Sequence, residues 1–177
     1  LLGFDGTVLL VSHDRKFMDN VVTSIMVFEE DSNVREYVGG YSDWVRHGGN
    51  LSDFAAPQTG FSSGAIDNEI QVATSDEHLY SSTFVNAGLK LNKDKENAAI
   101  IGGGDGGVAR ECISKGFSFI DWYELDPEVV DVCNKHLGSI VDRSTEKNSV
   151  KCIWGDAFQS IKSVEDDKYD KIFVDLD

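Results

Sequence analysis

The second half of the chain alternates between short apolar runs and segments whose apolar residues recur at helical spacing. The apolar runs are typical of buried strands, and they cover residues 98–101, 117–124, 150–154 and 171–174. Helices are predicted between them: one begins at Asp126-Pro127, a cap followed by proline, and another ends at Gly116. Strands that alternate with helices predict an α/β fold, a parallel sheet with right-handed crossovers and helices on both faces.

The first segment has a different pattern and predicts a small α/β fragment. Residues 7–12 form a buried-type strand, a short amphipathic helix follows, and two alternating runs at 24–28 and 34–38 predict a hairpin. Small and polar residues from 55 to 64 then predict a linker. Because the chain starts without Met and stops at the end of a predicted strand, we expect a fragment, truncated after the fourth strand of the sheet, whose last strand has a bare outer edge.

Composition and charge narrow the function classes. Apolar residues make up 41% of the 177 residues and charged residues 27%, the balance of a folded chain without long disorder. The chain has 16 Lys and Arg against 31 Asp and Glu, a net charge of −15. This charge disfavours nucleic-acid and membrane partners, which need clustered bases, and favours a cationic small substrate. The sequence has no apolar run of membrane-spanning length, and its start does not read as a signal peptide.

The cysteines do not indicate a metal site. Cys112, Cys133 and Cys152 form no C-x-x-C pair and are odd in number, so we expect neither a metal centre nor a disulfide framework. Two of them stand among apolar residues at helical spacing, where a free thiol acts as a small core hydrophobe. A reducing cytoplasm suits this pattern.

A glycine-rich turn and four acids carry the candidate chemistry. Gly102, Gly104 and Gly107 fit G-x-G-x-x-G between a strand and a helix, where glycines allow a tight turn and close approach of a ligand. Glu124 ends the next strand, 20 residues after Gly104, where an acid can bind both hydroxyls of a ribose. The other acids at strand ends are Asp105, Asp156 and Asp175. Because the carboxyl ends of parallel strands meet at one edge, we expect a ligand-binding rim there.

Several motifs together resemble a known family. They are Ile70-Gln71, Asp76-Glu77-His78-Leu79-Tyr80, Ile100-Ile101-Gly102-Gly103-Gly104-Asp105-Gly106-Gly107, Tyr123-Glu124-Leu125-Asp126, Gly155-Asp156-Ala157 and Tyr169-Asp170. With them, residues from about 68 to 177 resemble the spermidine/spermine synthase (aminopropyltransferase) family, which has a Rossmann-like, S-adenosylmethionine methyltransferase-like fold. The resemblance implies transfer of an aminopropyl group from decarboxylated S-adenosylmethionine to a polyamine. Methylthioadenosine would leave, and the full-length enzyme would be a homodimer.

The resemblance also implies a role for each candidate residue. The residues expected to bind the donor are Gln71, Gly102, Gly104, Asp105, Gly107, Glu124, Asp156 and Ala157. Among them, Glu124 would hold the ribose, Asp156 the adenine and Asp105 the propylamine group. Asp175 would be the acid that faces the acceptor amine, with Tyr80 beside it, and these two are the expected catalytic residues.

The sequence departs from the family pattern at two places. Ser81-Ser82 follow Tyr80 where the family often has His or Gln and then Glu. The family's D-S-S-D-P run is replaced by Asp175-Leu176-Asp177, and this ending is closer to that of the spermine-type members. The acceptor wall and most of the family's N-terminal β-rich region have no counterpart, so the acceptor amine stays open.

The first segment resembles a different family. The stretch from Phe4 to Arg15 looks like the switch-histidine strand of an ABC-F-type ATP-binding cassette, and that from Val38 to Trp44 looks like its closing motif. The printed sequence has no G-x-x-x-x-G-K-[ST] loop, so we expect His13 to be a relic rather than a working switch. The domains predicted in this way are an ABC-type C-terminal fragment at 1–54, a linker at 55–67, a partial N-terminal aminopropyltransferase region at 68–96 and the first half of a donor-binding domain at 97–177.

Three other interpretations stay open. An S-adenosylmethionine-dependent methyltransferase uses the same sheet, although Asp105 would repel the carboxylate of that donor. A nicotinamide dehydrogenase places its glycine loop similarly but does not account for the segment from Asp76 to Tyr80. The third is an inactive chimeric fragment or an ATP-binding ABC-F-type remnant, and we expect the chain as given to turn over nothing by itself.

Overall fold

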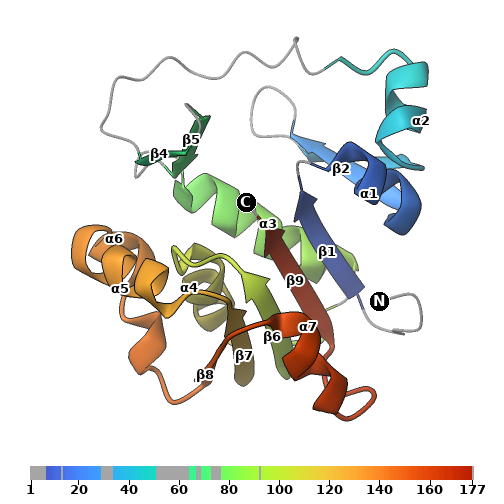
Figure 1. Ribbon diagram of the computed structural model, residues 1–177. Coiled ribbons are helices and arrows are strands. Elements are labelled where there is room, and N and C mark those ends of the chain that lie inside the picture. The colour runs from blue at the N-terminus through green and yellow to red at the C-terminus, as the bar shows by residue number, and fades with distance from the viewer. Residues whose placement is uncertain are drawn as a thin grey trace. The chain divides into compact units, whose positions relative to one another are not determined.

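A computed structural model describes residues 7–12, 14–28, 34–50, 64–66, 69–72, 77–91 and 93–176 (Figure 1). Residue contacts divide the chain into two compact units, one made of residues 3–11 and 62–177 and the other of residues 12–61. His13, Asp76 and most of the predicted linker lie outside the described residues.

The larger unit is built on a five-stranded sheet. In their order across the sheet the strands are β1 (Thr7–Ser12), β9 (Lys171–Leu176), β6 (Asn97–Gly102), β7 (Phe119–Glu124) and β8 (Val150–Trp154). Strand β6 pairs in parallel with both β7 and β9, and β7 pairs in parallel with β8. The four strands predicted from the second half of the sequence are therefore confirmed, with helices between them as a parallel sheet requires.

Strand β1 covers the outer edge of β9, which the sequence analysis expected to be bare. The two strands run in the same direction (Figure 1), and the amide of Thr7 donates to the carbonyl of Asp170 at 3.3 Å. Val8 and Leu10 pack against the core on one face, and Leu9 is buried. A strand that is apolar on both faces suits a parallel sheet whose two faces are both buried. The expectation of a bare edge is therefore wrong.

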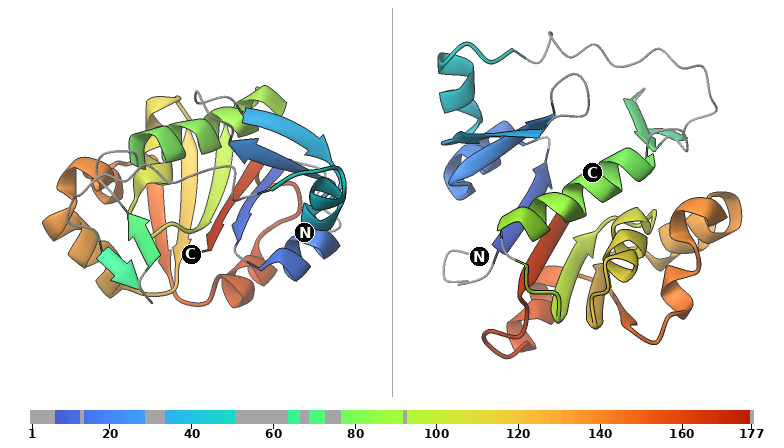
Figure 2. Two further views of the ribbon diagram at one scale, coloured as in Figure 1. Left: turned by 90° about the horizontal axis from the view of Figure 1, so that it is seen from above. Right: turned by 180° about the vertical axis from the view of Figure 1, so that it is seen from behind.

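Side chains alternate between two buried faces of the sheet, and helices cover both (Figure 2). On the face of helix α3 (Glu77–Leu91), the rings of Phe84 and Phe173 meet edge to face at 5.5 Å. On the opposite face, Tyr123 belongs to a buried cluster against which Ala157 and Val164 pack. The observed architecture is thus the predicted α/β fold.

Local sequence signals set the helix ends. The remaining helices and 3₁₀ turns of this unit are α4 (Gly107–Ser114), α5 (Pro127–His136), α6 (Gly138–Val141), α7 (Ala157–Ser160), η3 (Ser144–Glu146) and η4 (Ile161–Ser163). Asp126 accepts a hydrogen bond from the amide of Glu128 and Pro127 opens helix α5, as predicted, while Gly116 follows helix α4 with φ +84°. Helix α7 is short because the turn that follows it tightens into η4.

The smaller unit contains the predicted hairpin. Strands β2 (Ser24–Phe28) and β3 (Val34–Val38) pair antiparallel, between helices α1 (Arg15–Val21) and α2 (Tyr41–Arg46). Trp44 is buried beneath the rings of Tyr37 and Tyr41. In the larger unit, β4 (Gly64–Ile66) and β5 (Glu69–Val72) form a second short antiparallel pair.

Candidate functional site

The loop between β6 and α4 has a backbone that glycine alone adopts easily. Gly102, Gly103 and Gly106 have φ values of +79°, +64° and +79°, in the left-handed region. Gly103 donates to the carbonyl of Asp175 at 3.0 Å, and Gly106 donates to the carbonyl of Gly103 at 2.9 Å. These bonds close the loop tightly over the carboxyl end of β6.

Two of the predicted glycines also leave room for neighbouring groups. A Cβ on Gly102 would lie 2.1 Å from the carbonyl oxygen of Asp175. A Cβ on Gly104 would lie 2.8 Å from Cγ1 of Val129 and 3.2 Å from Oε2 of Glu124. A side chain at Gly102 would therefore displace the end of β9, and one at Gly104 would displace the side chain of Val129 and crowd Glu124.

The last strand brings an acid and a tyrosine together. The carboxylate of Asp175 is 6% exposed and accepts a hydrogen bond from the hydroxyl of Tyr80 at 2.7 Å. Tyr80 comes from helix α3, where its ring stacks on that of Phe84 at 6.0 Å. A carboxylate held by a phenol beside a glycine loop is suited to orienting an ammonium group and accepting its proton.

Glu124 lies next to the glycine loop at the end of β7. It is 9% exposed, and its Oε1 accepts from the amide of Asp126 at 3.0 Å. This bond fixes one carboxylate oxygen, while the other lies beside Gly104. A carboxylate fixed in this way at a strand end can accept hydrogen bonds from a diol.

Two of the predicted acids accept hydrogen bonds from amides in the first turn of a helix, Asp156 as the N-cap of α7 and Asp105 from the position before the N-cap of α4. Oδ1 of Asp105 accepts from the amide of Gly107 at 2.9 Å at the start of α4, and Oδ1 of Asp156 accepts from the amide of Phe158 at 2.8 Å at the start of α7. Asp156 is exposed and Ala157 half-buried. Each acid thus stabilises the start of a helix whether or not a ligand is bound.

The structure joins some of the predicted site residues and leaves others apart. Asp175 and Tyr80 contact each other and the loop, and Glu124 adjoins Gly104, whereas Asp156 lies at the end of the edge strand β8. Gln71 lies in β5, and its side chain is outside the described part of the structure. The roles assigned to these residues stay predictions.

Three residues of this region were not predicted from the sequence. Gly103 and Gly106 were inside the glycine run but outside the G-x-G-x-x-G positions, and the unbroken run was itself a signal of unusual backbone. Trp122 contacts the loop from below, through a hydrogen bond to the carbonyl of Gly102 at 2.8 Å. No sequence pattern predicts that contact.

Large apolar side chains are exposed at the same strand ends. Leu125 follows β7, Val129 lies in the first turn of α5, Trp154 ends β8 and Phe158 lies in α7, and all four are exposed. Single exposed apolar residues are ordinary on a protein surface, so these four carry no argument for a ligand by themselves.

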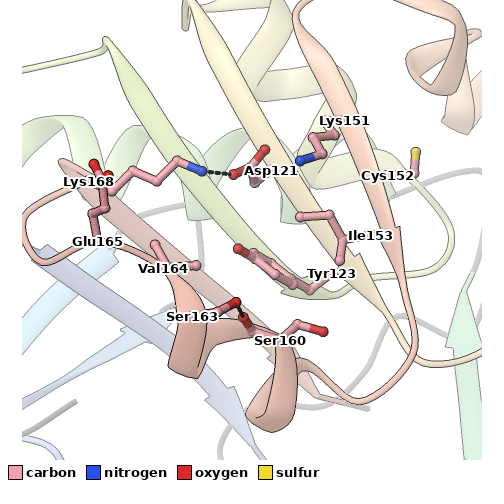
Figure 3. Close-up of a pocket in the computed structure, with 10 residues that line it drawn as sticks. All are labelled: Asp121, Tyr123, Lys151, Cys152, Ile153, Ser160, Ser163, Val164, Glu165 and Lys168. Atoms are coloured by element: carbon pink, nitrogen blue, oxygen red, sulfur yellow. Dashed lines mark hydrogen bonds and ion pairs between the residues drawn. The ribbon is translucent and has the colours of Figure 1, made fainter.

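A separate cavity of about 590 Å³ lies over β7 and β8, beside α7 and η4 (Figure 3). Asp121 accepts hydrogen bonds there from Lys168 and, at 2.7 Å, from Tyr169. Burial raises the pKa of Asp121, but these two hydrogen bonds outweigh burial and hold it below its ordinary value. The residues described as lining this cavity include none of the predicted site residues.

Within the described part of the chain, no helix has the length and apolar character to cross a membrane. No group of three or more His, Cys, Asp and Glu in that part is arranged to hold a metal ion. The three cysteines are free thiols, and burial raises the pKa of Cys112.

The parallel sheet, with a glycine loop after its central strand and acids at neighbouring strand ends, has a Rossmann-like, methyltransferase-like fold. Residues 77–177 match the spermine/spermidine synthase domain, and the chain belongs to this family.

Curated relatives share the second half of the chain. The polyamine aminopropyltransferase of Korarchaeum cryptofilum is 34% identical over 111 residues, which are 63% of this chain and 34% of that protein. The polyamine aminopropyltransferase of Prochlorococcus marinus strain MIT 9312 is 36% identical over 111 residues, 62% of this chain and 39% of that protein. The chain thus matches well under half the length of these relatives.

Solved structures show the same fold. Spermidine synthase from Thermotoga maritima superposes with a TM-score of 0.56 at 16% identity, covering 85% of this chain and 43% of that one. A spermidine synthase in complex with the transition state analogue AdoDATO gives the same score and identity, with 86% and 43% coverage.

Proposed function

We propose that the chain carries the donor-binding part of an aminopropyltransferase. The complete enzyme would move the aminopropyl group of decarboxylated S-adenosylmethionine to an amine of a polyamine. The observation that carries this proposal is the glycine loop bonded to Asp175, whose carboxylate is held by Tyr80, in a chain of the spermine/spermidine synthase family. The relatives named polyamine aminopropyltransferases support it.

The acids at the strand ends have the hydrogen-bonding capacity and the charge that this donor requires. Glu124 would accept hydrogen bonds from the ribose hydroxyls, and Asp156 would accept one from the adenine amino group. Asp105 would attract the ammonium of the propylamine arm. Gly102 and Gly104 let the loop lie directly against Asp175, Val129 and Glu124, and so keep the loop beside the proposed donor-binding acid.

In the proposed reaction, a nitrogen of the acceptor attacks the methylene carbon next to the donor's sulfonium. A carbon–nitrogen bond forms, the carbon–sulfur bond breaks with its electron pair going to sulfur, and methylthioadenosine leaves. An alkylammonium has a pKa of about 10 and must lose a proton first. Asp175, oriented by Tyr80, would hold that ammonium and accept its proton, and alignment of the two reactants would supply the remaining acceleration.

The net charge of −15 supports a polycationic acceptor, because a negative rim concentrates such a substrate. This steering is a rate effect that added salt weakens. We further propose that the complete enzyme is a cytoplasmic homodimer that uses no metal and binds neither nucleic acid nor a membrane.

Calorimetric titration of the chain with methylthioadenosine tests the donor site. Binding is the readout because the chain matches well under half of its relatives' length. We expect weak binding that falls at least tenfold in Gly104→Ala, whose new Cβ would clash with Val129 and crowd Glu124. Gly138→Ala is the matched control, since its Cβ would meet no atom within 4 Å, and it should bind as the parent does. A parent chain that binds no adenosyl ligand would overturn the proposal.

For residues 1–54 we propose a relic of an ABC-F-type cassette without ATPase activity. The reason is the absence of a phosphate-binding loop from the printed sequence. Hydrolysis of ATP by the chain that disappears in His13→Ala would contradict this proposal.

A further inference from the structure

The indole ring of Trp122 packs against the glycine loop from the side of the sheet. Its side chain is fully buried on β7. At one end of the indole, Nε1 donates to the carbonyl of Gly102 at 2.8 Å. At the other end, Cη2 lies against Gly106, 3.3 Å from where a Cβ on that glycine would be. One side chain therefore contacts both the first residue of the loop and the residue that precedes helix α4.

The indole supplies a hydrogen bond at the point where the sheet pairing stops. The register described between β6 and β7 ends at the pair Ile101–Tyr123, whereas Gly102 pairs with Asp175 on the other side. On the β7 side, the donor for the carbonyl of Gly102 is a side chain rather than a neighbouring strand. An N–H on a rigid buried ring gives this carbonyl a fixed direction.

The orientation of Gly102 sets the rest of the loop. The next residue, Gly103, donates to the carbonyl of Asp175 and accepts from Gly106. A change in the peptide plane after Gly102 would therefore disturb both of these bonds. Because Gly102, Gly103 and Gly106 all have positive φ, and glycine backbone is permissive, the loop has little conformational preference of its own.

We propose that Trp122 is a positioning residue for the donor site, acting through the glycine loop without touching the donor. Its indole N–H and ring hold the loop in the one conformation that presents Gly104 beside Glu124. This inference rests on the proposed donor site for its functional meaning, while the bracing of the loop is a property of the protein alone.

The test replaces Trp122 and follows individual amides by hydrogen exchange in NMR. Trp122→Phe keeps an aromatic ring but removes the donor to Gly102. Gly103 donates to Asp175, while Gly106 and Gly107 donate within the loop, and we expect these three amides to exchange about tenfold faster, the effect of losing one well-placed hydrogen bond.

Two variants on the same strand serve as matched controls. Tyr123→Phe removes a buried hydrogen bond on the opposite face, where the Tyr123 and Tyr169 hydroxyls lie 2.6 Å apart. Ile120→Val removes volume from the buried side chain two residues before Trp122. Both substitutions lower the global stability but remove no contact with the glycine loop. The amides of the loop should therefore exchange no faster, relative to the other amides of the sheet, than they do in the parent. Loop exchange in Trp122→Phe that matches these controls would overturn the inference.

Binding of methylthioadenosine supplies the functional readout. We expect Trp122→Phe to bind it about five- to tenfold more weakly than the parent, and the two controls to bind it as the parent does. Faster loop exchange with unchanged affinity would overturn the link between the loop and the donor. A parent chain that does not bind methylthioadenosine would count against the proposed function, while the exchange data would still decide whether Trp122 braces the loop.

Discussion

The hydroxyl of Tyr80 donates a 2.7 Å hydrogen bond to Oδ1 of Asp175, and so joins helix α3 to the end of β9. The backbone of Asp175 also accepts from Gly103. Asp175 therefore connects a helix, a strand and the glycine loop through one residue.

Removing either partner of this hydrogen bond should lower the free energy of unfolding, and a double-mutant cycle should show that the two side chains depend on each other. Tyr80→Phe and Asp175→Asn should each lower the free energy of unfolding by about 1–3 kcal/mol, because the bond involves a buried carboxylate. Urea denaturation of both variants and of the double variant forms a cycle, in which the double variant should lose less than the sum of the two. Additive losses would mean that the two side chains do not act together.

Strand β1 should contribute to the stability of the larger unit. Leu9→Ala removes a buried side chain between β9 and helix α3, and we expect a loss of about 2–3 kcal/mol in urea denaturation. Leu79→Ala is the control, because Leu79 is exposed on the same unit, and its effect should stay within about 0.5 kcal/mol. Equal effects of the two substitutions would show that β1 does not pair with β9 in solution.

Local sequence pattern was enough to predict most of the strands in both units. Residues 150–154 form β8 with the predicted bounds, and residues 24–28 and 34–38 pair as the predicted hairpin. In each case an apolar or alternating run is bounded by polar residues or glycine, so the signal lies within the segment itself.

Contacts between distant segments were not predictable in this way. The run at residues 7–12 predicted a strand, but its place beside β9 depends on an edge more than 150 residues away. The glycine run predicted a tight turn, whereas the indole of Trp122 beneath it depends on the register of β7 against β6. Periodicity reports which face of an element is apolar and says nothing of what packs against that face.

The buried carboxylate of Asp121 predicts an acid-sensitive contribution to stability. Its pKa is lowered on folding, so it stabilises the folded state above its unfolded pKa of about 3.9 and loses this effect as the pH falls through the folded value. Asp121→Asn should cost about 1–3 kcal/mol at pH 7 and progressively less below about pH 4. Urea denaturation at several pH values measures the difference, with the exposed Asp131→Asn as control. A cost that is the same at pH 7 and pH 2.5 would exclude the ionised carboxylate as its source.

The charge of Asp105 offers a way to separate aminopropyl transfer from methyl transfer. S-adenosylmethionine carries a carboxylate on the arm that its decarboxylated form lacks, so a nearby Asp should favour the second over the first by about 1–3 kcal/mol. Oδ1 of Asp105 also caps helix α4 by accepting from Gly107. Asparagine keeps an oxygen at that position and removes the charge, so Asp105→Asn changes the electrostatics while the cap survives.

We therefore expect Asp105→Asn to bind decarboxylated S-adenosylmethionine more weakly and to narrow its advantage over S-adenosylmethionine, with the thermal midpoint unchanged. Asp105→Ala removes both charge and cap, so it should show the same loss of selectivity together with a lower thermal midpoint. Calorimetric titration of both donors against the three proteins measures the selectivity, and thermal unfolding measures the cap. If Asp105→Asn shifts the two affinities equally, the carboxylate does not face the arm of the donor, and Asp105 serves the helix alone.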